Sequence, residues 1–145
     1  MIKEFLSKCR ANTYAAGVEG QKIDSGNKYS IRERDLEYRD IYFDQKWVFQ
    51  GQELIFEKEK SVWSMSYRGA AVEGTDTKEI FGYLQKILRE HSDEVRLPGD
   101  KNYTNGEWRY EDKCSGNFDE FEGFEKIYQN EKLVHWMKYF GGKIK

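Results

Sequence analysis

The sequence is poor in the residues that mark several common classes of protein. It has only two cysteines, Cys9 and Cys114, among 145 residues. These are too few for a disulfide scaffold and lack the spacing of a metal site. We therefore expect reduced thiols in a cytoplasmic protein. Residues 1–6 hold an acid and a base but no long apolar run, so neither a signal peptide nor a membrane span is expected.

The sequence also lacks a large excess of positive or negative charge, and it lacks the common catalytic motifs. The net charge is −2, and no run of Lys or Arg occurs, which argues against direct nucleic-acid binding. The two histidines do not pair with cysteines at zinc-ligand spacing. A phosphate-binding glycine loop, a GxSxG elbow and a kinase motif are all missing. We expect no metal, no cofactor and no membrane partner.

What the sequence does contain is an internal match. Residues 121–144 laid over residues 49–72, with a constant shift of 72, agree at ten of 24 positions, where average usage gives about one or two. The same shift pairs Tyr38 with Tyr110 and Asp40 with Asp112. The residues that recur are Phe49, Gly51, Glu53, Ile55, Glu59, Lys60, Val62, Met65, Tyr67 and Gly69. The match predicts a single domain, residues 1–145, built from two repeats of about 1–72 and 73–145.

The hydrophobic pattern predicts an α+β fold. Apolar residues at helical spacing indicate helices over 2–12 and 77–91, and the segments 15–33 and 94–106 read as loops. Each repeat is then a helix–strand–strand–strand unit, and two units form an antiparallel sheet packed against two helices with pseudo-twofold symmetry. The expected strands are 36–43, 46–57 and 61–69, then 107–114, 119–129 and 132–140.

Strand parity sorts the side chains into two faces. Trp63, Met65 and Tyr67 form an apolar face and should point inward, opposite Ser64, Ser66 and Arg68. In the second repeat His135, Met137 and Tyr139 take the inward positions, and His135 replaces Trp63. In the first strand of each repeat, Tyr38, Asp40 and Tyr42 share a face, echoed by Tyr110 and Asp112.

Two repeated acids break the apolar pattern. Glu53 and Glu125 lie two residues before Ile55 and Ile127 and share their inward face. A carboxylate there is costly unless it is paired or faces a wet cavity. Each acid is therefore either a structural strut, hydrogen-bonded to a tyrosine or a backbone amide, or part of a ligand site. The repeated tyrosines are likewise either core residues or ligand platforms, and a lone histidine such as His135 is usually structural.

The segments 38–42, 49–53, 62–69, 123–125 and 139–142 resemble an uncharacterised bacterial domain family that occurs alone or joined to a helix-turn-helix regulator head. The resemblance implies a bacterial, cytoplasmic and sensory protein, and brings no known activity. The resemblance includes no helix-turn-helix segment in this sequence, so we expect that a role in transcription regulation needs a separate DNA-binding partner. A second resemblance is architectural: effector-binding domains of the gyrase-inhibitor-like class also use two tandem units, and hold small cationic or aromatic ligands between them.

The function that we expect from the sequence is small-molecule binding or sensing, in a cleft between the two repeats. Aromatic walls and buried carboxylates suit a cationic or aromatic ligand. Two alternatives stay open: a small enzyme with paired cleft carboxylates as general acid and base, and a protein-interaction module that uses exposed sheet edges. The sequence also leaves a homodimer open. The expected lining is Tyr38, Asp40, Glu53, Trp63, Tyr67, Tyr110, Asp112, Glu125, His135 and Tyr139.

Overall fold

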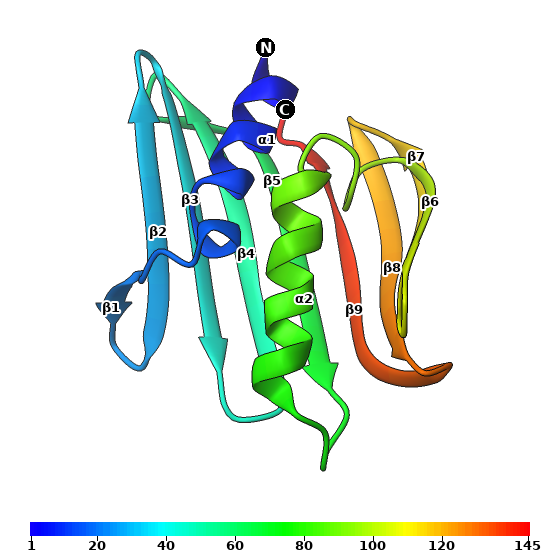
Figure 1. The fold of residues 1–145 in the computed structure, drawn as a ribbon. Coiled ribbons are helices and arrows are strands. Elements are labelled where there is room, and N and C mark those ends of the chain that lie inside the picture. Colours follow the sequence, from blue (N-terminus) through cyan, green and yellow to red (C-terminus); the bar gives the residue numbers. More distant parts are fainter.

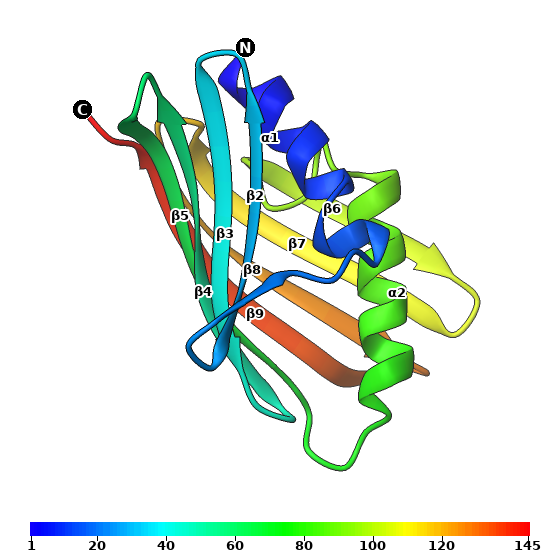
Figure 2. The same ribbon diagram turned by 90° about the vertical axis from the view of Figure 1, so that its left-hand side faces the viewer.

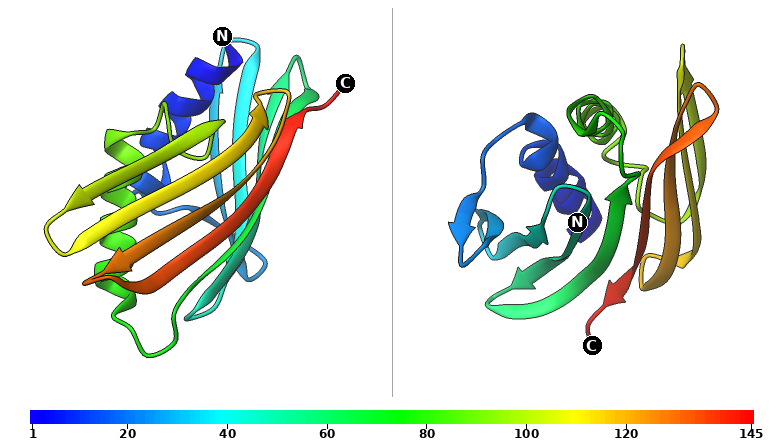
Figure 3. Two further views of the ribbon diagram at one scale, coloured as in Figure 1. Left: turned by 90° about the vertical axis from the view of Figure 1, so that its right-hand side faces the viewer. Right: turned by 90° about the horizontal axis from the view of Figure 1, so that it is seen from below.

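The computed structural model describes residues 1–145 as two α-helices and one nine-stranded antiparallel sheet. The elements are α1 (Ile2–Ala11), the short 3-10 helix η1 (Tyr14–Ala16), β1 (Gln21–Ile23), β2 (Gly26–Glu33), β3 (Leu36–Asp44), β4 (Val48–Glu57), β5 (Lys60–Ala71), α2 (Thr77–Glu90), β6 (Gly99–Asn105), β7 (Trp108–Asn117), β8 (Glu120–Gln129) and β9 (Lys132–Lys143). The strand order is β1-β2-β3-β4-β5-β9-β8-β7-β6. Both helices lie on one face of the sheet (Figure 1), which curves around them (Figure 3). The expected α+β class is confirmed.

Each helix forms where the sequence places an apolar stripe. In α2, Asp76 accepts a hydrogen bond from the backbone N–H of Glu79, at 3.2 Å, and so caps the first turn. Ile80, Leu84 and Ile87 recur at helical spacing and are buried. The apolar stripe of α1 ends in a charged residue, Arg10, which is buried as well. The helical layer therefore brings a cation to the sheet.

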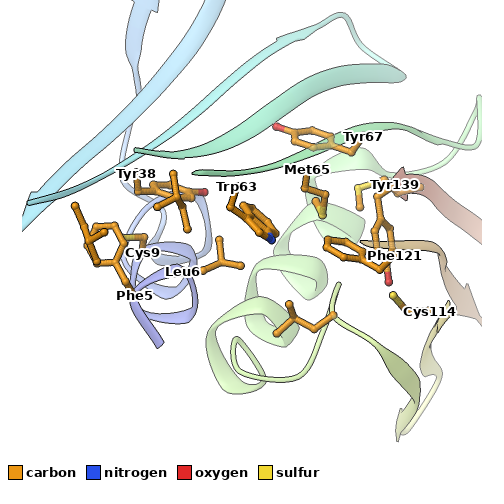
Figure 4. Packing of buried hydrophobic residues seen from close by; sticks show 14 residues of the cluster. Phe5, Leu6, Cys9, Tyr38, Trp63, Met65, Tyr67, Cys114, Phe121 and Tyr139 are labelled. Carbon is orange, nitrogen blue, oxygen red and sulfur yellow. The ribbon is translucent and has the colours of Figure 1, made fainter. Parts of the chain in front are cut away.

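The core lies between the helices and the concave face of the sheet, in two clusters. One packs beneath α1 and joins strands from both halves of the sheet; Phe5, Leu6, Trp63, Met65 and Tyr139 belong to it (Figure 4). The other packs beneath α2. The predicted faces of β5 are confirmed, because Trp63, Met65 and Tyr67 are buried while the three residues between and after them are more exposed.

Two segments that we expected to be loops contain strands. Residues 15–33 hold β1 and β2, and residues 94–106 hold β6. β1 and β6 are the two edge strands of the sheet, and most of their side chains are exposed. Their polar composition therefore resembles that of a loop, and backbone hydrogen bonds to one neighbour maintain the extended conformation. Each helix is followed by more than three strands, which corrects the expected unit.

The topology is one continuous sheet and does not by itself separate two units (Figure 2). The strand registers nevertheless agree with the shift of 72. Asp40 pairs with Glu53 as Asp112 pairs with Glu125, and β4–β5 has the same register as β8–β9. At the centre of the sheet β5 pairs with β9, and Tyr67 stands opposite its own counterpart, Tyr139.

Two matched glycines give room to these central tyrosines. Gly51 lies opposite Tyr67 and Gly123 opposite Tyr139. A Cβ atom on Gly51 would lie 2.6 Å from the hydroxyl of Tyr67, and one on Gly123 would overlap the Tyr139 ring. Both positions thus require glycine, because a tyrosine side chain lies directly against the backbone at each of them.

We expect Gly123→Ala to lower the free energy of unfolding by about 1–3 kcal/mol, because the added methyl group displaces a buried tyrosine. Urea denaturation measures the change. Gly82→Ala is the matched control: Gly82 lies within α2 with open space around it, so the same methyl group should stabilise the protein by about 0.5–1 kcal/mol. Equal effects of the two substitutions would contradict the packing argument.

Candidate functional site

Two tyrosines and two acids form a hydrogen-bonded set on β3, β4 and β5. The hydroxyl of Tyr38 donates to Oε2 of Glu53 at 2.6 Å. The hydroxyl of Tyr67 donates to Oδ1 of Asp40 at 2.5 Å. All four side chains point to the concave face and are buried. Two carboxylates are therefore next to each other in the interior of the sheet.

The same contacts recur on β7, β8 and β9. Tyr110 donates to Oε2 of Glu125 at 2.6 Å, and Tyr139 donates to Oδ1 of Asp112 at 2.5 Å. Each residue is the counterpart of one in the first set at the shift of 72. The repeated positions thus specify a repeated arrangement of buried acids and phenols.

An arginine from the helical layer neutralises Glu53. Arg10 of α1 donates from Nε and Nη2 to the Glu53 carboxylate at 2.6–3.1 Å. Its Nη1 donates to the carbonyl oxygens of Val95, at 3.2 Å, and Arg96. Burial alone would raise the pKa of Glu53, but the charge and hydrogen bonds of Arg10 hold it below its usual range. Both side chains are about 5 % exposed or less, so this pair is closed to a ligand.

Arg96, in the segment between α2 and β6, serves Glu125 in a similar way. Its Nε and Nη2 each donate to the Glu125 carboxylate at 2.9 Å, and its backbone N–H donates to Oδ2 of Asp112 at 2.7 Å. Against the effect of burial, the charge of Arg96 keeps the pKa of Glu125 lowered. Glu53 and Glu125 are therefore both engaged by side chains of this protein.

One cavity of about 320 Å³ lies between the first half of the sheet and α2. Hydrogen bonds position the parts of its wall that lie outside strands: α2 holds η1 through Gln85 Nε2, which donates to the carbonyl oxygen of Tyr14 at 3.0 Å, and Ala71 N–H donates to the carbonyl oxygen of Trp47 at 2.9 Å. Six aromatic side chains contribute to the wall, together with acidic and basic groups. The lining residues are Tyr14, Asp40, Tyr42, Asp44, Gln45, Lys46, Trp47, Phe49, Tyr67, Thr77, Phe81, Leu84 and Arg96.

Asp40 is the least satisfied of the four matched acids. Its only hydrogen-bond donor is the hydroxyl of Tyr67, and Oδ2 has none. Its counterpart Asp112 accepts from Tyr139, the Arg96 backbone and Lys101. Burial, and then the nearby charge of Glu53, raise the pKa of Asp40 to about 7. The cavity wall thus carries a carboxyl group with an unused oxygen.

Of the ten residues expected at the site, the structure places two, Asp40 and Tyr67, on the cavity. Glu53 and Glu125 do not line it. Trp63 stacks on Phe121 in the core beneath α1, with ring centroids 6.0 Å apart. Tyr38 is buried in the core beneath α1. The remaining four residues are buried on β7 and β9, in the second half of the sheet: Tyr110, Asp112, His135 and Tyr139.

His135 backs the cavity wall without reaching the cavity. Its ring stacks on Phe49, with centroids 5.8 Å apart, and meets the edge of Phe81. Neither ring nitrogen has a hydrogen-bond partner. Burial lowers the pKa of His135 to about 4, so the ring is neutral at neutral pH. The Phe49–His135 stack corresponds to the Trp63–Phe121 stack in the other repeat. At the shift of 72, His135 is the counterpart of Trp63, and Phe121 is the counterpart of Phe49.

Several residues that line or support the cavity were missing from the site residues expected from the sequence. Tyr42 shares a strand face with Asp40, and that parity was sufficient to find it. Arg10 stands four residues after the buried Leu6, on the apolar face of its helix, which is a second usable signal. Tyr14 and Trp47 lie in connecting segments, and no periodicity marks them.

The chain belongs to the family described as domain of unknown function DUF5680, which matches residues 40–144. The expected likeness to an uncharacterised family is thus confirmed. No curated protein and no solved structure matches the chain at a significant level. The matched segment contains α2 and most of the cavity lining, and begins at Asp40.

Two further features bear on the chemistry. No helix is both long enough and apolar enough to cross a membrane. No group of three or more His, Cys, Asp or Glu side chains is arranged to hold a metal ion. The cavity therefore offers aromatic surface, hydrogen-bonding groups and charge as its means of recognition.

We expect Glu53→Gln to lower the free energy of unfolding by about 3–5 kcal/mol, because it leaves the Arg10 guanidinium buried without its counter-charge. Thermal and urea unfolding measure the loss. The control is Glu33→Gln, which removes the acid of an exposed ion pair between Glu33 of β2 and Lys8 of α1, at 2.6 Å; its effect on stability should be far smaller, because exposed ion pairs contribute little. Similar losses for the two variants would show that Glu53 is not a strut.

The stability of the Asp40→Asn variant tests the state of that carboxyl group. The pKa of Asp40 is about 7 in the folded protein, against an ordinary value of 3.8. Its contribution to stability is therefore full below pH 4 and is lost as the pH rises through 7. The free energy of unfolding of Asp40→Asn minus that of wild type should therefore be larger at pH 8 than at pH 5. Asp44→Asn, at the exposed rim, controls for the loss of a charge; an unchanged difference between the two pH values would refute the raised pKa.

Proposed function

We propose that this domain binds a small cationic aromatic molecule in the cavity between β3–β5 and α2, and that it serves as a sensing domain. The observation that carries the proposal is the unused Oδ2 of Asp40 within an aromatic wall. A protonated nitrogen placed there satisfies the acid and removes the cost of its burial.

The aromatic residues favour the same class of ligand. Tyr14, Tyr42, Trp47, Phe49 and Phe81 surround the cavity on several sides. Aromatic faces attract cations through the ring quadrupole and stack on planar groups. The volume of about 320 Å³ suits a molecule of one or two rings. A ligand with a cation bound to Asp40 and a planar group between the aromatic rings contacts both the acidic and the aromatic parts of the wall.

The contacts give less support to the alternative functions. An acid–base pair requires two accessible carboxyl groups close together, but Glu53, which neighbours Asp40, is enclosed by Arg10 and Tyr38. The other acid of the cavity, Asp44, lies four residues further along β3, which is about 13 Å in an extended strand. An interaction module would use the free edges of β1 and β6. Neither alternative accounts for the open acid of the cavity.

We propose further that residues of about 1–72 and 73–145 are copies of one unit, and that the domain is accessory to a transcription regulator. The matched registers and the matched acid–tyrosine contacts support the first point. The resemblance to a family that includes regulator-linked members supports the second. On this view the cavity lies between the copies, because α2 and Arg96 belong to the second and β3–β5 to the first.

Binding of tryptamine, measured by thermal shift and calorimetry at pH 8, tests the proposal. Asp40→Asn should weaken tryptamine binding by roughly tenfold or more, the scale of a charge-assisted hydrogen bond. Binding of the uncharged analogue 3-ethylindole should change by less than about twofold, since it has no cation to lose.

The control is Asp119→Asn, which makes the same substitution at an exposed residue outside the cavity and should leave tryptamine affinity unchanged. Failure of wild type to bind tryptamine, benzylamine and a panel of similar aromatic amines would refute the proposed function. So would an equal loss of affinity in the two variants.

A further inference from the structure

Arg96 differs from Arg10, the other arginine that pairs with an inward-facing acid, in its hydrogen bonds and in its position at the cavity. All three nitrogens of the Arg10 side chain that can donate have acceptors within the protein. In Arg96, Nε and Nη2 are engaged by Glu125, while no acceptor of this chain meets Nη1. Arg96 lines the cavity and Arg10 does not. One edge of a fixed guanidinium is therefore available to a ligand.

The backbone at Arg96 supports a role beyond pairing with Glu125. Its φ is 58°, in the left-handed region that a residue with a side chain rarely adopts. Such strain persists only where surrounding contacts hold it, and it gathers at functional sites. The contacts here are the N–H bond to Asp112 and the two bonds to Glu125. They hold the guanidinium at the cavity instead of in solvent.

Asp40 and Arg96 thus present opposite and complementary groups to one cavity. Oδ2 of Asp40 is an acceptor without a donor, and Nη1 of Arg96 is a donor without an acceptor. The two residues form no ion pair with each other, whereas Arg96 does so with Glu125. Lys46 adds a second positive charge at the rim, where its Nζ lies 4.9 Å from the centre of the Trp47 ring. A group that satisfies both Asp40 and Arg96 must carry a donor and an acceptor.

We infer that the ligand is an aromatic zwitterion, with its protonated nitrogen on Asp40 and a carboxylate on Nη1 of Arg96. This inference rests on the proposed function and specifies its ligand. A cation alone satisfies Asp40 but leaves the guanidinium edge unused in a partly desolvated site. A carboxylate fits that edge because guanidinium–carboxylate hydrogen bonds are among the strongest that side chains form.

Matched sets of probes test the inference on the wild-type protein. In the first set, the three compounds share the indole ring: tryptophan carries both charges, tryptamine carries only the cation, and indole-3-propionate carries only the anion. The second set is 4-(aminomethyl)benzoate, benzylamine and 4-methylbenzoate, in which the charges stand further apart. In at least one set the zwitterion should bind tenfold or more tightly than either partner, as measured by calorimetry.

A protein variant then locates the gain. Arg96→Lys keeps a cation beside Glu125 but lacks the branched guanidinium, so the ratio of amine to zwitterion dissociation constants should fall to about one. Arg109→Lys, the same change at an arginine outside the cavity that also pairs with a glutamate, Glu111, should leave the ratio at its wild-type value. If Arg96→Lys fails to fold, the double variant Arg96→Gln, Glu125→Gln removes both charges together and should also bring the ratio to about one.

The outcomes separate this inference from the proposed function. Amines that bind wild type in an Asp40-dependent way, with no zwitterion binding more than twofold better, overturn the inference and leave the proposed function in place. A zwitterion advantage that persists in a folded Arg96 variant also overturns it. Failure of all six probes on wild type counts against both.

Discussion

The ion pairs of Glu53 with Arg10 and of Glu125 with Arg96 are the constraint on which the rest of the structure depends. The sheet contributes the two acids, and the helical layer and its following segment contribute the two bases. A carboxylate with almost no exposure is tolerated only beside a cation. The side chain of Arg10 also donates to the carbonyl oxygens of Val95 and Arg96. Because of these bonds, α1, the segment after α2 and the concave face of the sheet have one fixed relative position, and the cavity has a fixed shape.

Residues that match between the two repeats form the scaffold, and positions at which the two repeats differ form the candidate site. Asp40 and Asp112 occupy matched places, yet only Asp112 is closed by additional donors. Tyr42 faces the cavity, while the residue 72 positions on is Cys114. Tyr14 and Trp47 come from segments outside the internal match. A cavity therefore forms beside one acid and is filled at the other.

Sequence reasoning found the features that depend on period and on repetition. The apolar stripes located both helices, and alternation identified the inward faces of Glu53 and Trp63. It did not find β1, β2 or β6. Of these, the edge strands β1 and β6 are polar and lack a hydrophobic period. It also did not find the partners of the acids, because Arg10 and Arg96 reach them from segments 43 and 29 residues away. Contacts of that kind are determined by the packing of layers, which a local pattern does not encode.

The central pairing of β5 with β9 has a consequence for the growing chain. The two strands are separated by the whole of α2 and three further strands, so β5 is complete well before its partner is made. Until then β5 presents an open edge, the kind of surface on which chains associate wrongly. Because Tyr67 pairs with the residue 72 positions on, two nascent copies can join β5 to β5 in the native register, about a twofold axis through Tyr67. The register that closes the monomer is therefore also a register in which two unfinished chains can pair.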